Sequence, residues 1–250
     1  MALAKFRSFL GIAKEATRAA GVAPTAVAPT DFIPVKSMTP FDNMKYVDDE
    51  NWRGSMVDIY GTQITVKYSE YEFGGDVFPD TIGYALAGVL GDVATTGASA
   101  PYTHTMAVKN STTGQALPYT ITDFNGNNAR YFAGAQFSEV NFKWNVDGLL
   151  EYTAKATGVA SATTTTPTNS YSNVVSMPAW ECAVSIAGSS TLKLENGDLS
   201  IRRTGITPMF TLSNAQFPYQ IWQGALSVEG SFTFVMEDDT ELNYYLNNTQ

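Results

Sequence analysis

The stretch from residue 138 to residue 157 decides the fold class. Apolar and polar side chains alternate on both sides of an Asp-Gly pair, in the order Ser138-Glu139-Val140-Asn141-Phe142-Lys143-Trp144-Asn145-Val146-Asp147-Gly148-Leu149-Leu150-Glu151-Tyr152-Thr153-Ala154-Lys155-Ala156-Thr157. Side chains along a β-strand point alternately to two faces, so each half predicts a strand with one buried and one wet face. Asp-Gly between two such runs is a strong hairpin signal. The stretch therefore predicts a long hairpin with one apolar and one polar side.

The same alternation recurs along the chain and indicates a mainly β protein. It predicts strands over 64–69 and 226–234, with shorter strand candidates over 103–109, 118–123, 130–135, 181–187, 191–194 and 199–204. Turn signals separate these runs at Asn125-Gly126, Gly188-Ser189 and Asn196-Gly197.

Two short helices are expected between the strands. Residues 79–90 begin with proline and an acid and are followed by Gly91, which are start and stop signals. Residues 238–246 begin in the acidic run Glu237-Asp238-Asp239, which we interpret as a helix cap rather than a metal site. The first twenty residues fit either a helix or a strand over 8–13.

A faint internal repeat suggests the domain organisation. Residues 64–86 and 226–246 share an alternating strand, an Asp-Thr pair and a short helix, at a spacing of roughly 160 residues, far longer than solenoid periods. The Thr-rich segment between them has the composition of a linker. We expect two tandem β units, with an extended proline-rich arm over 1–40, a first unit over 41–158, a linker over 159–178 and a second unit over 179–250. Within the first unit, 42–61 is expected to be a long charged loop.

Charge and composition exclude several classes of chemistry. The 250 residues include 15 Lys and Arg against 24 Asp and Glu, a formal charge of −9. That balance argues against a nucleic-acid binder with a basic face, whereas an acidic wall would repel phosphate. A single cysteine, Cys182, excludes an intrachain disulfide, and a single histidine, His104, excludes a multi-histidine metal site. We interpret His104 as a polar strand residue. The run 123–127 lacks the glutamate of a calcium loop, so it is interpreted as a plain turn.

No stretch of about 18 apolar residues predicts a membrane helix. The N-terminus also lacks the long apolar segment of a signal peptide. We therefore expect the chain to be made and assembled in a cytosol.

Several segments, spread in order over nearly the whole chain, carry a family resemblance. They are 11–15 (GIAKE), 41–43 (FDN), 53–56 (RGSM), 73–84 (FGGDVFPDTIGY), 147–153 (DGLLEYT) and 237–242 (EDDTEL). Together they resemble the major tail tube proteins of long-tailed, siphovirus-type bacteriophages. The segments are mostly turns and caps, so the resemblance concerns shape rather than catalytic residues.

The resemblance implies antiparallel β-sandwich or part-barrel units with short flanking helices. Such subunits form rings, and the rings stack into a hollow tube through which the genome is delivered. In related tubes, long strands of neighbouring subunits pair side by side and close one continuous inner barrel. A duplicated subunit would make a ring of three with pseudo-six-fold symmetry, and an unduplicated one a ring of six. The linker and the repeat favour the ring of three. Similar proteins continue past the second helix, so we expect C-terminal strands of the second unit to be missing.

The resemblance also implies the partners and the location. The chain's main partner would be itself, with a tape measure protein inside the lumen and tail terminator and distal tail or baseplate proteins at the ends. Genome DNA would pass without specific binding, and no membrane contact is expected. The protein would be part of the virion tail, assembled in the host cytoplasm. No enzymatic activity, cofactor or metal is expected.

Two sets of residues are candidate assembly sites. The polar sides of the 138–157 hairpin and of 226–234 are expected to face the lumen, with the candidates Glu139, Asn141, Lys143, Asn145, Glu151, Thr153, Lys155, Glu229, Ser231 and Thr233. The hairpin's own charges nearly cancel, so an acidic lumen is expected from the whole-chain charge. An ordinary solvated sheet face is the alternative interpretation.

The charged loop holds the second set. Trp and Arg concentrate at interface hot spots, so the candidates for contacts between rings are Asp48, Asp49, Glu50, Trp52 and Arg53. The arm over 1–40 is a further candidate. A mobile surface loop is the alternative here.

Two other functions remain open at this point. A carbohydrate-binding β-sandwich, as in an adhesin or lectin, would suit an aromatic content of 12%. Most of those aromatics, however, alternate toward the core. A glycoside hydrolase would need two carboxylates at a set separation, and the many acids supply candidates without specificity.

Overall fold

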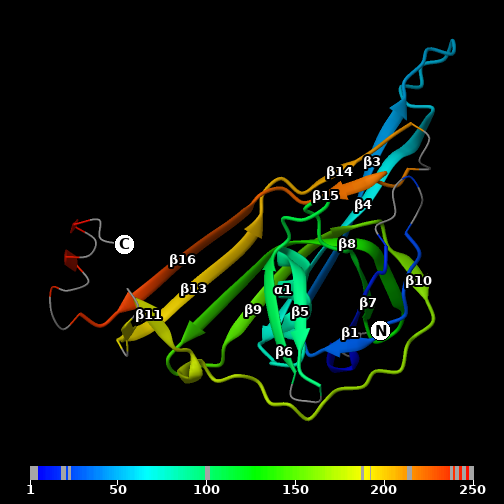
Figure 1. Ribbon diagram of the computed structural model, residues 1–250. Coiled ribbons are helices and arrows are strands. Elements are labelled where there is room, and N and C mark those ends of the chain that lie inside the picture. Colours follow the sequence, from blue (N-terminus) through cyan, green and yellow to red (C-terminus); the bar gives the residue numbers. More distant parts are fainter. Residues whose placement is uncertain are drawn as a thin grey trace.

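Strand β8 (Ala129–Asn145) belongs to two layers of one sheet and organises the fold (Figure 1). The computed structural model describes residues 5–17, 21, 24–98, 102–186, 189–191, 193–212, 216–236, 239, 242–243 and 246–247. Besides β8, its elements are the 3-10 helices η1 (Lys5–Arg7) and η2 (Ala179–Glu181), the helix α1 (Ile82–Leu90), and the strands β1 (Phe9–Lys14), β2 (Asp31–Ile33), β3 (Ser37–Asp49), β4 (Gly61–Asp76), β5 (Gly91–Thr96), β6 (Thr103–Val108), β7 (Tyr119–Phe124), β9 (Glu151–Gly158), β10 (Ala162–Thr164), β11 (Val184–Ile186), β12 (Ser189–Thr191), β13 (Leu194–Arg203), β14 (Thr207–Met209), β15 (Gln220–Trp222) and β16 (Leu226–Phe234).

The two halves of β8 have different neighbours. The first half pairs with β7 and β10, and β7 leads on to β1 and β2. The second half pairs with β9 on one side and β13 on the other, which gives a layer in the order β3-β4-β9-β8-β13-β16. Gly134, with φ 64°, lies where the β7–β8 register shifts. Glycine adopts that conformation readily, so the strand can bend from one layer into the other.

Aromatic rings fill the space between the layers. Phe137 is fully buried and meets Phe73 and Tyr119 edge-to-face, with ring centroids 6.1 and 5.4 Å apart. Helix α1 covers this core, and Gly88 on its inner face lies so close to Phe137 that an added Cβ would be 2.2 Å from the ring. The helix can therefore pack onto the sheet only with glycine at that position.

The expected mainly β, antiparallel architecture is confirmed, and so is its most explicit element. The hairpin predicted over 138–157 is the β8–β9 pair, with Lys143 opposite Glu151 and Asn141 opposite Thr153. The helix predicted over 79–90 is α1, which begins at Ile82 and ends before Gly91 at φ 99°. Asn125-Gly126 forms the β7–β8 turn, as expected. Residues 8–13, which fitted either a helix or a strand, lie mostly in strand β1.

Several boundaries differ from the prediction. Asn196 and Gly197 lie inside β13, so the strands expected over 191–194 and 199–204 are not separated by a turn there. An added Cβ at Gly197 would be 2.9 Å from the Trp144 ring, so this glycine admits a neighbouring side chain rather than a turn. The candidates 130–135 and 138–146 are one continuous strand, β8. The strand expected over 181–187 is shorter: η2 ends at Glu181 and β11 covers 184–186.

The segments expected to be irregular contain strands. The segment 1–40 holds β1, whose Leu10 and Ile12 are fully buried in the core, and β2. The loop expected over 42–61 is shorter, because β3 continues to Asp49 and β4 begins at Gly61. Pro40 is tolerated inside β3 because β3 is an edge strand, where a missing N–H breaks no ladder bond.

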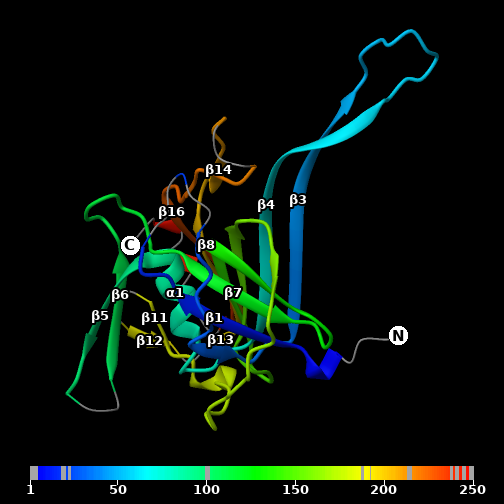
Figure 2. The ribbon, with the colours of Figure 1, turned by 90° about the vertical axis from the view of Figure 1, so that its right-hand side faces the viewer.

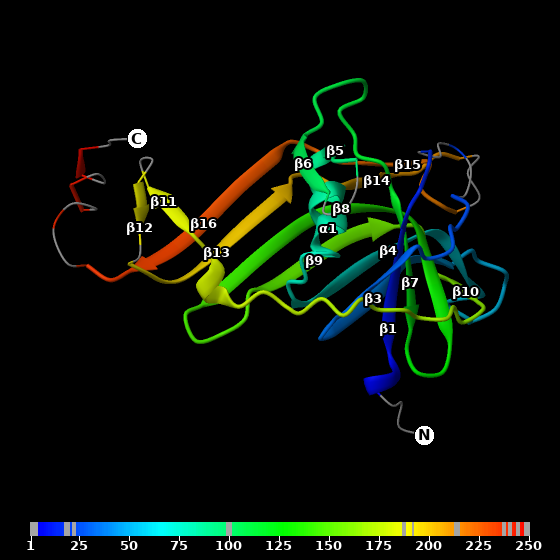
Figure 3. The ribbon, with the colours of Figure 1, turned by 60° about the horizontal axis from the view of Figure 1, so that its bottom comes forward.

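The two expected units share one sheet, because β13 pairs with β8 over residues 196–202. The linker contains the short strand β10, and its remaining length runs along the outside of the body (Figure 3). The second helix, expected over 238–246, lies largely outside the described residues; Leu242, Asn243 and Leu246 are helical. In the part of the chain that is described, no helix is long and apolar enough to cross a membrane.

Candidate assembly surfaces

One face of the six-stranded layer is polar across its whole width. Residues paired directly across an antiparallel sheet point to the same face, so the register defines rows of side chains. The rows are Thr39-Glu72-Lys155-Glu139-Arg202-Ser227, Ser37-Gly74-Thr153-Asn141-Ser200-Glu229, Asp76-Glu151-Lys143-Asp198-Ser231 and Asn145-Asn196-Thr233. All of the lumen candidates lie on this polar face, so the strands bring them together as the alternation predicted.

The opposite face of the same strands is apolar. Phe73, Tyr152 and Val140 are buried there in the core. Phe142 and Trp144 continue the apolar side toward the end of β8 and are partly buried. The layer is therefore amphipathic, with its wet side left open by the rest of the fold.

Ion pairs link neighbouring strands on the polar face. Lys155 Nζ lies 3.3 Å from Glu139 Oε2, and Arg202 pairs with Glu229. Lys36, just before β3, lies 2.6 Å from Asp76 and 2.8 Å from Glu151. These hydrogen bonds, to Asp76 first and then to Glu151, raise the pKa of Lys36 above its usual value. The side chains of Glu139 and Asp76 are 28% and 17% exposed, whereas those of the other five residues are at least 46% exposed. Each pair therefore has at least one partner in contact with water and contributes little to folding, at most about 1 kcal/mol.

Acids outnumber bases on this face. Its basic residues are Lys143, Lys155 and Arg202, and Lys36 lies next to it. Its acidic residues are Glu72, Asp76, Glu139, Glu151, Asp198 and Glu229, and Glu70 follows on the same side of β4. The hairpin alone is nearly neutral, and the excess comes from β4 and β16, because Asp198 and Arg202 cancel each other on β13. The sequence reasoning did not single out the β4 and β13 residues. Alternation along 68–76 could have revealed Glu70 and Glu72, whereas the presumed turn at Asn196-Gly197 hid those of β13.

Both outer strands of this layer have a free edge. Among the described residues, β3 pairs with β4 alone and β16 pairs with β13 alone. Each pair of neighbours in the layer is antiparallel, so with six strands the two outer ones run in opposite directions. Unpaired strand edges are templates for pairing with another chain.

The β3–β4 hairpin projects far beyond the body (Figure 2). Asp48 and Asp49 lie at the end of β3, and Glu50, Trp52 and Arg53 lie in the loop at the tip. Arg53 pairs with Asp49, and its guanidinium lies over the Tyr60 ring, 4.6 Å from the centroid. The hairpin therefore brings all five candidates for contacts between rings to one place.

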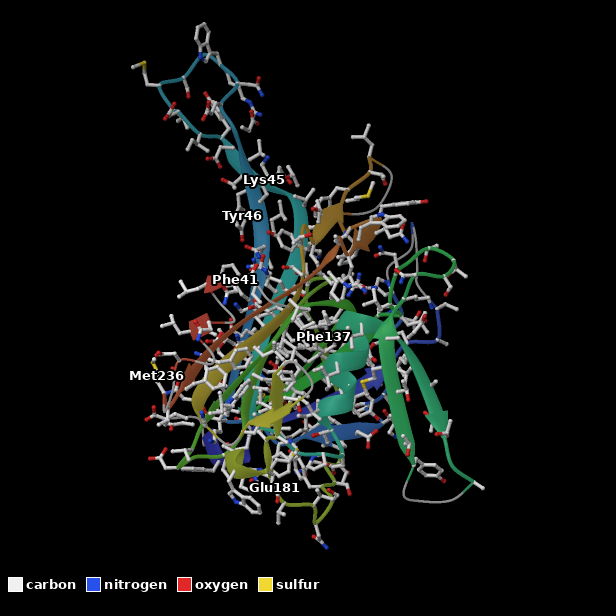
Figure 4. All side chains as sticks on the ribbon, turned by 60° about the vertical axis from the view of Figure 1, so that its left-hand side comes forward. Phe41, Lys45, Tyr46, Phe137, Glu181 and Met236 are labelled. Carbon is white, nitrogen blue, oxygen red and sulfur yellow. The ribbon has the colours of Figure 1, made fainter. Side chains whose placement is uncertain are left out.

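The tip exposes large apolar side chains as well as charges. Trp52 and Met56 are fully exposed, and Tyr46, Val47, Val57 and Ile59 are at least 46% exposed. Figure 4 shows Phe41, Lys45 and Tyr46 along the same projecting hairpin, whereas Phe137 lies inside the body. Exposed apolar groups gathered on one projection are typical of a contact surface.

The single histidine lies on a strand, as interpreted from the sequence. His104 lies on exposed strand β6, and its Nδ1 is 2.9 Å from the Thr95 hydroxyl, with no acid in the described contact. Across the described ranges, no group of three or more His, Cys, Asp or Glu side chains is placed to hold a metal ion.

Comparison with known proteins agrees with this reading. A search of curated proteins finds no match. The family model described as phage tail tube protein matches residues 5–250. A match of that extent spans both expected units as well as both candidate surfaces. The chain belongs to the phage tail tube protein family and is a structural subunit of a bacteriophage tail tube.

Proposed function

We propose that copies of this chain form a ring by continuing the six-stranded layer across its free edges, with the polar face toward the tube lumen. The observation that carries the proposal is an amphipathic layer whose two outer strands run antiparallel to each other and, among the described residues, each have one edge without a partner strand. A head-to-tail copy would place its β3 beside β16 in the antiparallel sense that the rest of the layer already has. Such heterologous contacts close into rings, and closure removes the exposed edges.

The polar face suits a conduit for DNA. Duplex DNA carries about one negative charge per 1.7 Å of axis, so a basic wall would hold it at many points. Here three basic side chains are already paired with acids, and Glu70, Glu72 and Asp198 add further negative charge. A wall of this kind repels phosphate and lets DNA slide.

Changing Glu70 and Glu72 to lysine should make assembled tubes retain duplex DNA at low salt in co-sedimentation. If the original tubes retain as much DNA as the variant, this lumen assignment is wrong.

The order of strands supports the ring of three rather than six. The pair β3–β4 is followed by α1, and the pair β13–β16 is followed by the helical residues Leu242, Asn243 and Leu246. Both pairs lie in one layer, on either side of β9 and β8. One chain would therefore supply two related sectors of the ring. Top views of purified rings that resolve six chains would contradict this assignment.

The projecting β3–β4 hairpin is proposed to join one ring to the next. Its tip carries Trp52 and Met56 fully exposed beside Asp48, Asp49 and Glu50. A tape measure protein in the lumen and terminator or baseplate proteins at the ends would complete the assembly within a virion tail made in the host cytoplasm. Neither a substrate nor a membrane is proposed, and no feature of the site favours the carbohydrate-binding alternative.

Electron microscopy of the purified protein tests the edge pairing. Phe41, 59% exposed near the free edge of β3, is changed to lysine, because a lysine on an edge strand opposes pairing. The matched control is Phe6→Lys, at an exposed phenylalanine outside the sheet. Phe41→Lys should give folded monomers without rings, and Phe6→Lys should give tubes. Normal rings from Phe41→Lys would overturn the pairing at β3.

A further inference from the structure

The outer half of the β3–β4 hairpin has a second support besides its own ladder. Strand β9 pairs with β4 from Ser69 to Asp76. From Gly61 to Tyr68, no strand in the described part of the chain pairs with that edge of β4. A hairpin of this length held at one end alone would be free to swing about its base.

Gln216 lies on this otherwise bare edge. Its carbonyl accepts a hydrogen bond from the Lys67 N–H at 2.9 Å, and its side-chain Nε2 donates to the Ile64 carbonyl at 2.7 Å. Gln216 comes from the segment between β14 and β15, so it is 152 positions away from Ile64 in the sequence. One residue therefore replaces two strand contacts at this edge.

The two bonds span an irregularity in β4. In the β3–β4 register, Lys45 pairs with Val66 and Tyr46 pairs with Ile64, so Thr65 is an extra residue, a β-bulge. A bulge bends the strand that carries it and switches the edge to which its backbone groups point. This is why the Lys67 N–H and the Ile64 carbonyl both face Gln216. Figure 2 shows that the hairpin changes direction along its length.

The segment around Gln216 is held against β4 by neighbouring side chains. The Tyr68 and Phe210 rings have centroids 6.3 Å apart, and the Lys67 ammonium lies 4.6 Å from the centroid of the Phe217 ring. Gln216 itself has φ 71°, which is uncommon for a residue with a side chain. A conformation of that kind persists where the surroundings enforce it, and here it points the side-chain amide at Ile64.

We infer that Gln216 is a positioning residue that clamps the bulge in β4 and so fixes the direction in which the β3–β4 hairpin projects. The inference rests on the proposed role of the hairpin tip in joining rings. Its consequence is that a residue remote from the tip controls where Trp52 and its neighbours reach the next copy.

Spin labels measure the direction of the hairpin in the unassembled subunit. In a Cys182→Ser background, Met56→Cys labels the exposed tip and Asn127→Cys labels the exposed β7–β8 turn on the body. Gln216→Met keeps the side-chain length and the backbone bond but removes the donor to Ile64. Gln216→Lys restores a donor of similar reach. Gln63→Ala, at an exposed glutamine on the same hairpin, is the matched control.

The expected result is a narrow distance distribution in the parent, Gln216→Lys and Gln63→Ala proteins, and a clearly broader one in Gln216→Met at an unchanged melting midpoint. Tubes of Gln216→Met should then be shorter than those of the parent. An equally narrow distribution in Gln216→Met would overturn the clamp, whatever its tubes look like. A broad distribution with tubes of normal length would instead show that hairpin direction does not matter for stacking, and would contradict the role of the tip.

Discussion

The core around Phe137 and the hairpin tip around Trp52 use aromatic side chains in opposite ways. Phe137 has no exposed surface and touches two other rings, whereas Trp52 is fully exposed. Between layers, aromatic burial stabilises the subunit itself. At the tip, the same kind of surface has nothing to contact within the described chain. The difference fits a core that serves folding and the proposal that the tip contacts other copies.

The largest expected difference between the two regions is in folding stability. Phe137→Ala should lower the free energy of unfolding by about 3–5 kcal/mol, because it leaves a cavity among rings that cannot close. Trp52→Ala with Arg53→Ala should change it by less than about 0.5 kcal/mol, because neither side chain is packed in the core. Chemical denaturation of the unassembled subunit measures both values.

In tube assembly the tip should matter more, although it contributes less to folding stability than the core. The Trp52→Ala and Arg53→Ala subunit should fold but fail to extend tubes, as measured by tube length in electron micrographs. Trp180→Ala removes an exposed tryptophan from η2 on the body and should leave tube length unchanged. Tubes of full length from the variant with both substitutions would show that the tip does not join one ring to the next.

A smaller effect is expected where β13 joins the body. Buried Arg203 donates through Nε to the Val89 carbonyl at 2.7 Å and through a guanidinium nitrogen to Leu90 at 3.0 Å, at the end of α1. Arg203→Met should lower the free energy of unfolding by about 2–3 kcal/mol, because the Val89 carbonyl would be buried without this charged donor. Urea denaturation measures the loss.

The neighbouring arginine is the control for this effect. Arg202 lies on the polar face and pairs with exposed Glu229, so Arg202→Met should cost less than about 1 kcal/mol. Equal losses for the two variants would mean that the contact with α1 does not anchor β13. The comparison thus separates a buried charge in the body from an exposed one on the polar face.

The smallest expected effect concerns the bend in β8. Glu15 Oε1 accepts hydrogen bonds from the Gly134 N–H and the Thr120 hydroxyl, each at 2.7 Å. Burial nevertheless raises the pKa of Glu15 above its usual 4.5, because loss of solvation outweighs these two bonds. The fold therefore favours the protonated acid, and the stability gained is fully present below pH 4.5 and is lost as the pH rises through the raised pKa.

Glu15→Gln removes this titration while keeping an acceptor for both donors. Relative to the variant, the original protein should become less stable as the pH rises from 4.5 through the raised pKa of Glu15, measured as the difference in melting midpoint. Parallel pH profiles would show that Glu15 ionises in the fold as it does in the unfolded chain.

The alternation of side chains predicted much of the candidate surface but not its width. Glu139, Lys143 and Glu151 could be assigned to one face, because a two-residue period is a local property of the chain. The turn predicted at Asn196-Gly197 was wrong, because a glycine beneath a bulky neighbour and a glycine in a turn look alike in a sequence. Trp144, which makes that glycine necessary, comes from another strand. The buried position of β1 also depends on other strands, β2 and β7, so it could not be predicted from the proline-rich segment alone.

The sequence by itself determined the antiparallel β class, the β8–β9 hairpin, helix α1 and the acidic excess, because each depends on neighbouring residues or on simple counts. The tertiary structure decided that β13 and β16 extend the same layer and that Gln216 reaches Ile64. It also decided that no strand of the described residues pairs with the outer edges of β3 and β16. Those features depend on contacts between residues far apart in the chain, up to 152 positions for Gln216 and Ile64. The three-dimensional packing selects such contacts, and the local pattern of residues does not encode them.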